Sequence, residues 1–439
     1  MNYESRPLTE LGAKMIDKKL HKQKVVLLKI DTGGGKTFMA IHAIGRIMKN
    51  HPQKTANVLV LTTSKQKNDL YFEQSFKAYT KATGVKFNIY VTNYEQLYAP
   101  NHKYDAYNWM RKKPKKSTII LMDEGHHAKN PTSKTSKQII RLSKLPSFSR
   151  AIFLTATPIT NSLLDAEMYL IMAGFYKNKT QFENLHVQKW DDHFKPIVKD
   201  KSGKIDNNLL NYPWHIINLL NKITVYIDTD KLKPKVFLSE KTFKFNKFIQ
   251  HDYRQIRKQL QDGLIESSSE CIAMQRQFVA EHQEARLDYL KKIIQSPKRP
   301  QTPILIFYQY VAEFESLYAF IKKELPDYRL RIINGATKTQ NPSTKPKHNK
   351  TIVLIQYQAG GEGLNTPWSN FSIFFTPAFS AEKYIQARGR NVRAMQKGPV
   401  YQIRFKVKNT INDQMWTKII DQKQKFTKKL QQELINSQD

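Results

Sequence analysis

The chain has 439 residues and a large excess of basic side chains: 72 Lys and Arg against 37 Asp and Glu give a formal net charge of +35. Hydrophobic residues make up 40% and aromatic residues 11%, which excludes a disordered basic tail, because such tails lack the apolar side chains that build a core. The single cysteine, Cys271, excludes a disulfide framework and a cysteine-based zinc cluster.

The uneven charge predicts a polyanionic partner, and nucleic acid is the obvious one. Charge alone leaves DNA, RNA and a ribosomal surface open. No stretch approaches the roughly 18 uninterrupted apolar residues of a membrane span, and the chain starts without an apolar signal segment. We therefore expect no membrane partner and a cytoplasmic location, with the nucleus as an alternative.

Short apolar runs alternate with polar helical stretches over residues 1–165, which predicts strand–helix–strand units around a parallel sheet. The expected strands are Val25–Ile30, Val58–Thr62, Phe87–Val91, Thr118–Met122 and Ala151–Leu154. A second such block covers residues 301–410. Its expected strands are Ile304–Tyr308, Leu330–Ile333, Thr351–Ile355, Phe371–Phe375 and Val400–Phe405.

Residues 166–300, between the two blocks, have a different pattern. Tyr253–Leu264 and Glu270–Ile294 carry apolar residues at helical spacing, which predicts a mostly helical insertion. We expect residues 411–439 to form one polar C-terminal helix. The predicted fold class is α/β, with two parallel-sheet lobes in tandem and a helical insertion between them.

The first expected strand runs into a glycine-rich turn, Thr32-Gly33-Gly34-Gly35-Lys36-Thr37, which is followed by a helical stretch. Glycines let a backbone wrap a triphosphate, with N–H groups aimed at its oxygens from a helix N-terminus. Lys36 would neutralise the β and γ phosphates, and the Thr37 hydroxyl would ligate Mg²⁺. The full signature has Gly where this chain has Ile30. An ordinary strand–helix turn is the alternative, and the context favours a nucleotide site.

The strand at Thr118–Met122 ends in a pair of carboxylates, Asp123 and Glu124, followed by Gly125 and His126. Asp123 would hold Mg²⁺, while Glu124 would orient and deprotonate an attacking water. His126 would lie near the γ-phosphate. An acidic pair on an ordinary surface is the alternative.

The strand at Ala151–Leu154 ends in two hydroxyl residues, Thr155 and Thr157. Hydroxyls at this place can bond the acidic pair and couple nucleotide state to the second lobe. Strands favour β-branched residues in any case, so the string is weak evidence by itself.

Within residues 384–393 of the second block, Arg388, Arg390 and Arg393 lie in a span of six residues. We expect Arg390 and Arg393 to share one helix face and to contact the γ-phosphate, because they are three residues apart. Arginine beside developing phosphoryl charge is a large catalytic factor. A solvated basic helix face is the alternative.

In their order along the chain, these strings resemble those of superfamily-2 helicases and translocases, and more specifically of the Swi/Snf group. The shared segments are Thr32–Thr37, Val91–Leu97, Asp123–Asn130, Thr155–Asn161, Leu305–Phe307, Gly360–Asn365, Gln386–Arg393 and Val400–Phe405. The resemblance implies two RecA-like lobes: lobe 1 over 1–165, the insertion over 166–300, lobe 2 over 301–410 and the C-terminal helix over 411–439. It also implies ATP and Mg²⁺ as cofactors and a catalytic role for Gln386.

Two departures from the family pattern stand out. The phosphate loop has the general superfamily form, and an adenine-reading glutamine is replaced near Thr9 or Glu10. The choice of ATP over GTP therefore depends on the resemblance. The short insertion is similar to compact phage- or virus-encoded members that migrate DNA branches, which would place the protein in a bacterial host cytoplasm.

The resemblance implies a DNA-stimulated ATP hydrolase, a translocase or helicase acting in branch migration or fork remodelling during replication, recombination or repair. An RNA helicase or a transcription-associated motor is a second hypothesis, and a non-catalytic nucleic-acid clamp is a third, of another class. We expect a monomer or a weak oligomer.

The resemblance also places duplex contacts on loops at the carboxyl ends of both sheets. The residues are Thr63, Ser64, Thr92, Asn93, Lys129 and Asn130 in lobe 1 and Tyr308, Gly360, Gly361 and Asn365 in lobe 2. Hydroxyls, amides and glycine N–H groups suit phosphate contacts that carry no base information. Ordinary loop ends are the alternative for each.

Two basic segments lie outside these motifs. The densest run, Arg111–Lys116, precedes the strand that leads to Asp123, so we expect it at the opposite edge of the sheet, as a solvated turn. A secondary nucleic-acid contact is the alternative, and a nuclear-import signal is a third. Lys338–Lys350 follows a second-lobe strand and is better placed to touch a branch or fork.

Overall fold

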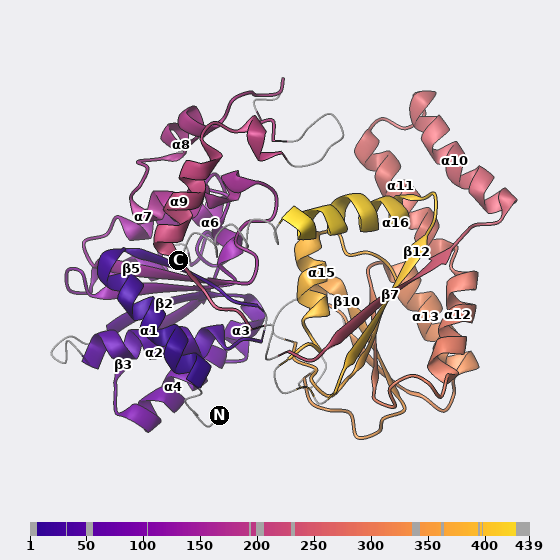
Figure 1. Ribbon diagram of the computed structural model, residues 1–439, viewed down its shortest axis with the longest axis horizontal. Coiled ribbons are helices and arrows are strands. Elements are labelled where there is room, and N and C mark those ends of the chain that lie inside the picture. Colours follow the sequence, from indigo (N-terminus) through magenta and orange to yellow (C-terminus); the bar gives the residue numbers. More distant parts are fainter. Residues whose placement is uncertain are drawn as a thin grey trace. The chain divides into compact units, whose positions relative to one another are not determined.

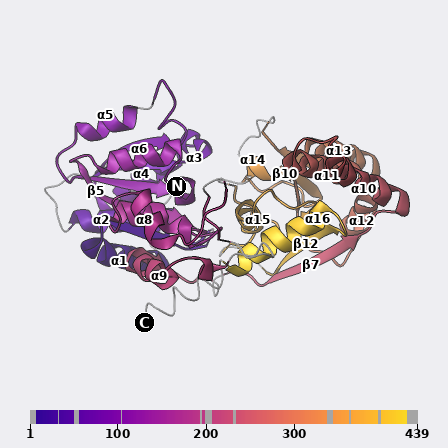
Figure 2. The same cartoon turned by 90° about the horizontal axis from the view of Figure 1, so that it is seen from above.

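The computed structural model describes residues 7–31, 33–49, 56–102, 104–192, 195–198, 206–229, 233–335, 343–360, 364–393, 396 and 398–426. These form two compact units (Figures 1 and 2). The first comprises the described residues up to Thr229 and those from Lys425 on, and the second comprises the described residues between them. In this described part, no helix is long and apolar enough to cross a membrane.

The first unit contains a sheet of six parallel strands in the order β3-β2-β4-β5-β1-β6. The strands are β1 Val25–Lys29, β2 Ala56–Thr62, β3 Phe87–Asn93, β4 Thr118–Asp123, β5 Phe148–Thr155 and β6 Thr224–Tyr226. Alternate side chains of each central strand enter two separate cores. Both faces of the sheet are therefore covered, as parallel sheets require.

Helices on each face complete these two cores. One core takes apolar side chains from α1 (Pro7–Lys22), α2 (Lys36–Lys49) and α4 (Tyr71–Thr83). The other core takes them from α5 Asp105–Arg111, α6 Lys134–Ser143, α7 Glu167–Ala173, α8 Lys179–His186 and α9 Pro213–Ile223. A short helix, α3 (Ser64–Asn68), follows β2 directly.

The second unit repeats the plan, with strand order β7-β12-β11-β8-β10-β9. Its strands, again all parallel, are β7 Val236–Phe243, β8 Ile304–Tyr308, β9 Arg329–Ile333, β10 Thr351–Gln356, β11 Phe371–Phe374 and β12 Val400–Val407. Helices α12 (Glu284–Gln295) and α13 (Val311–Glu324) share one core with the sheet. On the other face, α15 (Ala381–Arg388) packs with the C-terminal helical segment.

The predicted fold class is confirmed, and all ten expected strands are present with small shifts at their ends. The stretch between the blocks is divided: α7, α8 and α9 belong to the first unit, and α10 (Lys247–Gln261), α11 (Ser268–Glu281) and α12 belong to the second. That stretch also supplies two strands that the sequence analysis did not predict. β6 has three residues, and β7 is an edge strand whose pattern alternates poorly.

The C-terminal segment is helical from Ile411 through α16 (Ile411–Gln414) and a π-helical turn (Met415–Asp421) to residue 426, and residues 427–439 lie outside the described part. The expectation of one polar C-terminal helix is corrected for the described part, because Trp416 and Ile420 are buried in the second unit. The buried guanidinium of Arg404 fixes this segment through an ion pair with Asp421, at 2.8 Å.

One buried carboxylate in the first unit makes stability depend on pH. Burial raises the pKa of Glu167 in α7 to about 8; the charge of Lys179 opposes this shift and that of Glu183 adds to it. The folded chain therefore keeps a proton that the unfolded chain loses near the ordinary value of 4.5. The free energy of unfolding should fall as pH rises from about 4.5 to about 8, and the loss should be complete above that window.

We expect Glu167→Gln to remove this fall. At pH 8 the variant should be more stable than the parent by a few kcal/mol, since each pKa unit of difference is worth about 1.4 kcal/mol, and near pH 4.5 the two should be alike. Thermal unfolding of both chains across this range measures the effect. Equal pH slopes in parent and variant would contradict it.

Candidate active site

The turn after β1 has the backbone that a phosphate loop needs. Gly33 and Gly35 both have φ of +85°, a conformation that L side chains rarely adopt. At Gly34 a Cβ atom would lie 2.6 Å from Ile30 Cδ1, so a side chain has no room there. The turn then enters α2 with Lys36 and Thr37, both buried at the helix N-terminus. Thr32 lies outside the described residues.

The lysine of this loop faces the acidic pair. Lys36 Nζ lies 3.9 Å from Glu124 Oε1, and the two side chains are 9% and 17% exposed. The structure thus brings together two segments that are nearly ninety residues apart, at the carboxyl ends of β1 and β4. A triphosphate held by the loop would have a cation and a carboxylate beside it.

Asp123 ends β4 with its carboxyl group buried. Burial raises its pKa to about 7; the charge of Glu124 adds to this shift, while Lys36 and a hydrogen bond from Gln66 oppose it. The Tyr94 hydroxyl donates a 2.6 Å hydrogen bond to the Asp123 backbone carbonyl. Sequence reasoning missed Gln66 and Tyr94, which stand only a few residues beyond the ends of β2 and β3.

The backbone at Glu124 is strained. Its φ of 48° and ψ of 51° are left-handed, which is rare for a residue with a side chain. Gly125 follows, where a Cβ atom would meet Phe153 Cδ1 at 2.8 Å. This tight turn directs the chain from β4 into a short 3₁₀ helix, Gly125–Ala128, that carries His126.

His126 connects the acidic pair to the hydroxyl pair. Its Nδ1 atom lies 3.3 Å from Glu124 Oε2 and 3.3 Å from Thr155 Oγ1. Thr155 is fully buried at the end of β5, and its hydroxyl oxygen accepts a 3.1 Å hydrogen bond from the Thr157 N–H. The predicted link between the hydroxyls and the carboxylates therefore passes through the imidazole.

The loops after β2 and β3 meet through polar side chains. Asn93 Nδ2 donates to Ser64 Oγ at 3.0 Å, and Ser64 Oγ donates to Glu95 Oε2 at 3.2 Å. Thr63 and Thr92 are buried: Thr63 caps α3, and Thr92 donates to Gln96 Oε1 at 3.0 Å. Of the four predicted residues in these loops, only Ser64 is exposed.

Lys129 and Asn130 follow the 3₁₀ helix. Lys129 Nζ donates to Thr160 Oγ1 at 2.7 Å and lies 3.7 Å from Asp165 Oδ2, so its charge is partly neutralised. Asn130 is exposed, and its side-chain oxygen accepts from the Thr132 N–H at 3.0 Å.

In the second unit, Tyr308 is not at the surface, where a nucleic-acid contact would require it to be. It is 1% exposed and packs in the core against Phe314. We therefore correct the expectation of a nucleic-acid contact by its side chain. The N–H groups of Gln309 and Tyr310 after it donate to Glu313 Oε2, at 3.0 and 3.2 Å.

Glu313 belongs to a buried ion pair that the sequence analysis missed. Arg286 NH1 of α12 lies 3.7 Å from Glu313 Oε1, with side chains 1% and 0% exposed. Thr376 donates to Glu313 Oε2 at 2.9 Å, and Arg286 donates to the Phe375 carbonyl at 3.4 Å. This network joins α12 to the loops after β8 and β11.

The other predicted residues of this edge lie near β10. Gly360 ends the short helix α14 (Tyr357–Gly360), and Gly361 lies outside the described residues. Asn365 is exposed, and its N–H donates to Ser343 Oγ at 3.0 Å. Of the predicted Lys338–Lys350 loop, residues 343–350 are described, and Ser343 also accepts from the Trp368 indole at 2.8 Å.

Gln386 is buried in α15, but the helix ends at Arg388, so Arg390 and Arg393 do not share a helix face. The expectation of a common helix face is corrected. The chain leaves the helix because the Arg390 carbonyl accepts from the Thr366 N–H at 3.1 Å and Asn391 donates to Ser372 Oγ at 2.7 Å. The Arg390 guanidinium donates to the Leu364 carbonyl at 3.0 Å.

The basic run Arg111–Lys116 lies at the amino end of β4, as expected, while Asp123 lies at the carboxyl end. All of its residues except Lys113 are exposed, and Lys113 Nζ lies 4.6 Å from the centre of the Trp109 ring.

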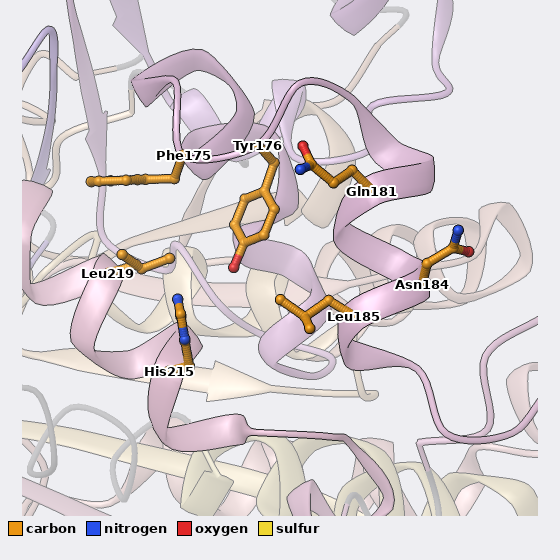
Figure 3. A pocket seen from close by; sticks show the side chains of 7 residues that line it. All are labelled: Phe175, Tyr176, Gln181, Asn184, Leu185, His215 and Leu219. Atoms are coloured by element: carbon orange, nitrogen blue, oxygen red, sulfur yellow. The ribbon is translucent and has the colours of Figure 1, made fainter.

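A cavity of about 570 Å³ lies among the helices of the first unit, and none of its lining residues was predicted as a site residue. Figure 3 shows the Tyr176 ring between Leu219, His215 and Leu185. The other lining residues are Phe175, Gln181 and Asn184. Its side chains include no carboxylate, Lys or Arg, in contrast to the loop at Lys36.

Comparison with known proteins gives two family matches, one on each unit. The family "Type III restriction enzyme, res subunit" matches residues 3–160, and "Helicase conserved C-terminal domain" matches residues 285–395. The first covers the phosphate loop and the acidic pair. The second covers most of the second sheet and the Gln386–Arg393 segment.

Curated relatives match most of this chain. "Protein CHROMATIN REMODELING 4" of Arabidopsis thaliana is 20% identical over 366 residues, which are 76% of this chain and 16% of that protein. "ISWI chromatin-remodeling complex ATPase ISW2" of Saccharomyces cerevisiae is 23% identical over 369 residues, 75% of this chain and 30% of that protein. The chain thus spans less than a third of the length of either relative.

Among solved structures, the Sulfolobus solfataricus SWI2/SNF2 ATPase core in complex with dsDNA is similar, with 18% identity and a TM-score of 0.42 over 100% of this chain and 94% of that one. The order of the site segments and the two family matches define a superfamily-2 helicase-type ATPase. Within that superfamily, the relatives to which the chain is similar are Swi/Snf-like chromatin-remodelling ATPases.

Proposed function

We propose that the chain hydrolyses ATP and uses the energy to translocate along duplex DNA, acting in branch migration or fork remodelling. The main support for ATP hydrolysis is the contact of Lys36 with Glu124, because it joins a phosphate-binding loop to a carboxylate that can accept a proton. The net charge of +35 and the exposed polar loop at Ser64 support a nucleic-acid partner. The relatives' printed role in chromatin supports DNA.

The residues present fit a magnesium–nucleotide complex. The cradle at Gly34 leaves no room for a side chain, and a hydroxyl and a carboxylate, Thr37 and Asp123, are the oxygen ligands that Mg²⁺ prefers. When bound, the ion neutralises phosphate charge. Lys36 would bind the β and γ phosphates, and Glu124 would accept the proton of the attacking water at its side-chain oxygen.

The neighbouring residues would position this chemistry. His126 would hold Glu124 in place and link it to Thr155, whose hydroxyl bonds the Thr157 N–H. We propose that Thr155 and Thr157 couple hydrolysis to movement of the second unit. Catalytic roles for Gln386, Arg390 and Arg393 stay a prediction from the resemblance.

A panel of nucleic acids tests the proposal. ATP hydrolysis should be slow without nucleic acid and should rise with duplex DNA, forks and four-way junctions more than with RNA or single strands. The Lys36→Ala variant should hydrolyse no ATP with any of them and should still bind DNA. Greater stimulation by RNA would favour the RNA helicase, and no hydrolysis with any nucleic acid would favour the non-catalytic clamp.

A further inference from the structure

Helix α10 carries a stripe of basic side chains along one face. Lys247, His251, Arg254 and Lys258 are spaced four, three and four residues apart, which places them on a single side of a helix. All four are exposed. The residues that α10 buries, Tyr253 and Ile256, lie on the opposite side.

The helix that presents this stripe is firmly fixed to the second unit. The Tyr253 hydroxyl accepts a 2.7 Å hydrogen bond from the Ile411 N–H. Ile256 packs with Cys271 of α11, so α10 and α11 form a pair with a small core of its own. The four side chains therefore project from a rigid support.

The charges of Lys247, Arg254 and Lys258 are not neutralised within the protein, and the His251 ring makes a 3.0 Å hydrogen bond with the Gln255 side chain. Among the described residues, none of the four forms an ion pair with a carboxylate. The acidic residue of α10, Asp252, lies on a different side of the helix, about a quarter turn or more away from the stripe. An uncompensated basic face is available to a polyanion from solution.

The stripe begins at the edge of the sheet that already carries the proposed nucleic-acid loops. β7 is parallel to β12 and ends at Phe243, so α10 starts at the carboxyl edge, as does the loop after β8. Arg276 of α11 lies 5.3 Å from the ring of Phe379, and that ring lies 5.8 Å from Tyr310 in the loop after β8. Figure 1 shows α10 and α11 next to each other at one end of the second unit.

An exposed aromatic ring flanks the stripe: Phe248 lies three residues before His251 and four before Asp252, so both are its neighbours on the helix surface. Phe248 is 83% exposed. Aromatic rings beside basic side chains bind single strands, because unpaired bases stack on the ring while the cations track the phosphates. From Lys247 to Lys258 the helix extends about 16 Å, which is long enough for several phosphates of one strand.

We propose that Lys247, His251, Arg254 and Lys258, together with Phe248, form a second nucleic-acid contact that takes an unpaired strand, such as one arm of a fork. The inference rests on the proposed function in taking nucleic acid as the polyanion. It assigns α10 a role in choosing branched over blunt substrates.

A matched pair of triple variants tests it. Lys247→Gln/Arg254→Gln/Lys258→Gln removes three charges from the stripe, and Arg111→Gln/Lys112→Gln/Lys115→Gln removes three from the basic run at the amino edge. Binding of labelled single strands, forks and blunt duplexes is measured without ATP at several salt concentrations. The stripe variant should bind single strands and forks at least about 10-fold more weakly, with a salt slope lower by about 2, while the control should resemble the parent.

The Phe248→Ala variant provides an independent test of the proposal. It should weaken binding of single strands and forks by about 5- to 100-fold, the effect of losing one stacked base, and should leave the affinity for blunt duplex unchanged. Equal losses in the two triple variants would overturn the proposal, since they would indicate a general charge effect. Unchanged binding in the stripe variant, or a loss confined to blunt duplex, would overturn it as well. Because these binding experiments need no ATP turnover, they can be interpreted even if the chain hydrolyses no ATP. Absent ATP hydrolysis would refute the proposed function but not this proposal.

Discussion

Replacing Glu124 by Gln is expected to lower ATP turnover by about 10²- to 10⁴-fold, the contribution typical of a general base. Gln has nearly the same shape but cannot take the proton of the attacking water. It also loses the charge that faces Lys36 at 3.9 Å. Phosphate release at saturating ATP and DNA measures the effect.

Nucleotide binding separates this role from a structural one. The Glu124→Gln variant should still bind a fluorescent ATP analogue and DNA with affinities near those of the parent. Glu324→Gln is a suitable control, because it makes the same change in a carboxylate of the second unit whose partner is Lys291 at 2.7 Å. Its turnover should equal that of the parent. Turnover near the parent's in Glu124→Gln would show that another group accepts the proton.

The second large effect is expected at the buried pair of Arg286 and Glu313. Burial lowers the pKa of Arg286 and raises that of Glu313, and the charge of each partner opposes the shift of the other. Removing one partner leaves a charge in the core without compensation. Arg286→Met should therefore lower the free energy of unfolding of the second unit by about 3–5 kcal/mol.

The double variant Arg286→Met/Glu313→Gln distinguishes charge from packing. Gln keeps an oxygen that can accept from the Gln309 and Tyr310 N–H groups, and it carries no charge. The double variant should recover much of the stability that Arg286→Met loses. Thermal unfolding of the parent, the single variant and the double variant measures this. A double variant no more stable than the single one would contradict it.

The sequence was sufficient for features with a local signal. The glycine turn before Lys36 and the carboxylates after an apolar strand could be placed at one sheet edge, because parallel strands share the direction of their carboxyl ends. The link from Glu124 through His126 to Thr155 needed the register of β4 against β5, and sequence alone does not give that.

Features without a local signal were missed or misplaced. Both faces of β8 are buried, so its apolar run does not tell which alternate side chains face which core, and Tyr308 was wrongly expected at the surface. Arg286 and Glu313 are far apart in sequence, and no spacing rule joins them. The end of α15 before Arg390 depends on contacts of Asn391 and Thr366 with other elements.

The left-handed backbone at Glu124 has a consequence for how the chain tolerates change. Folding alone would favour glycine or asparagine at this position, because a larger side chain costs free energy in that conformation. Under the role proposed for Glu124, the carboxylate is kept there at a cost in stability. Selection for stability alone would then favour chains that replace Glu124, and these would fold better but hydrolyse ATP slowly or not at all.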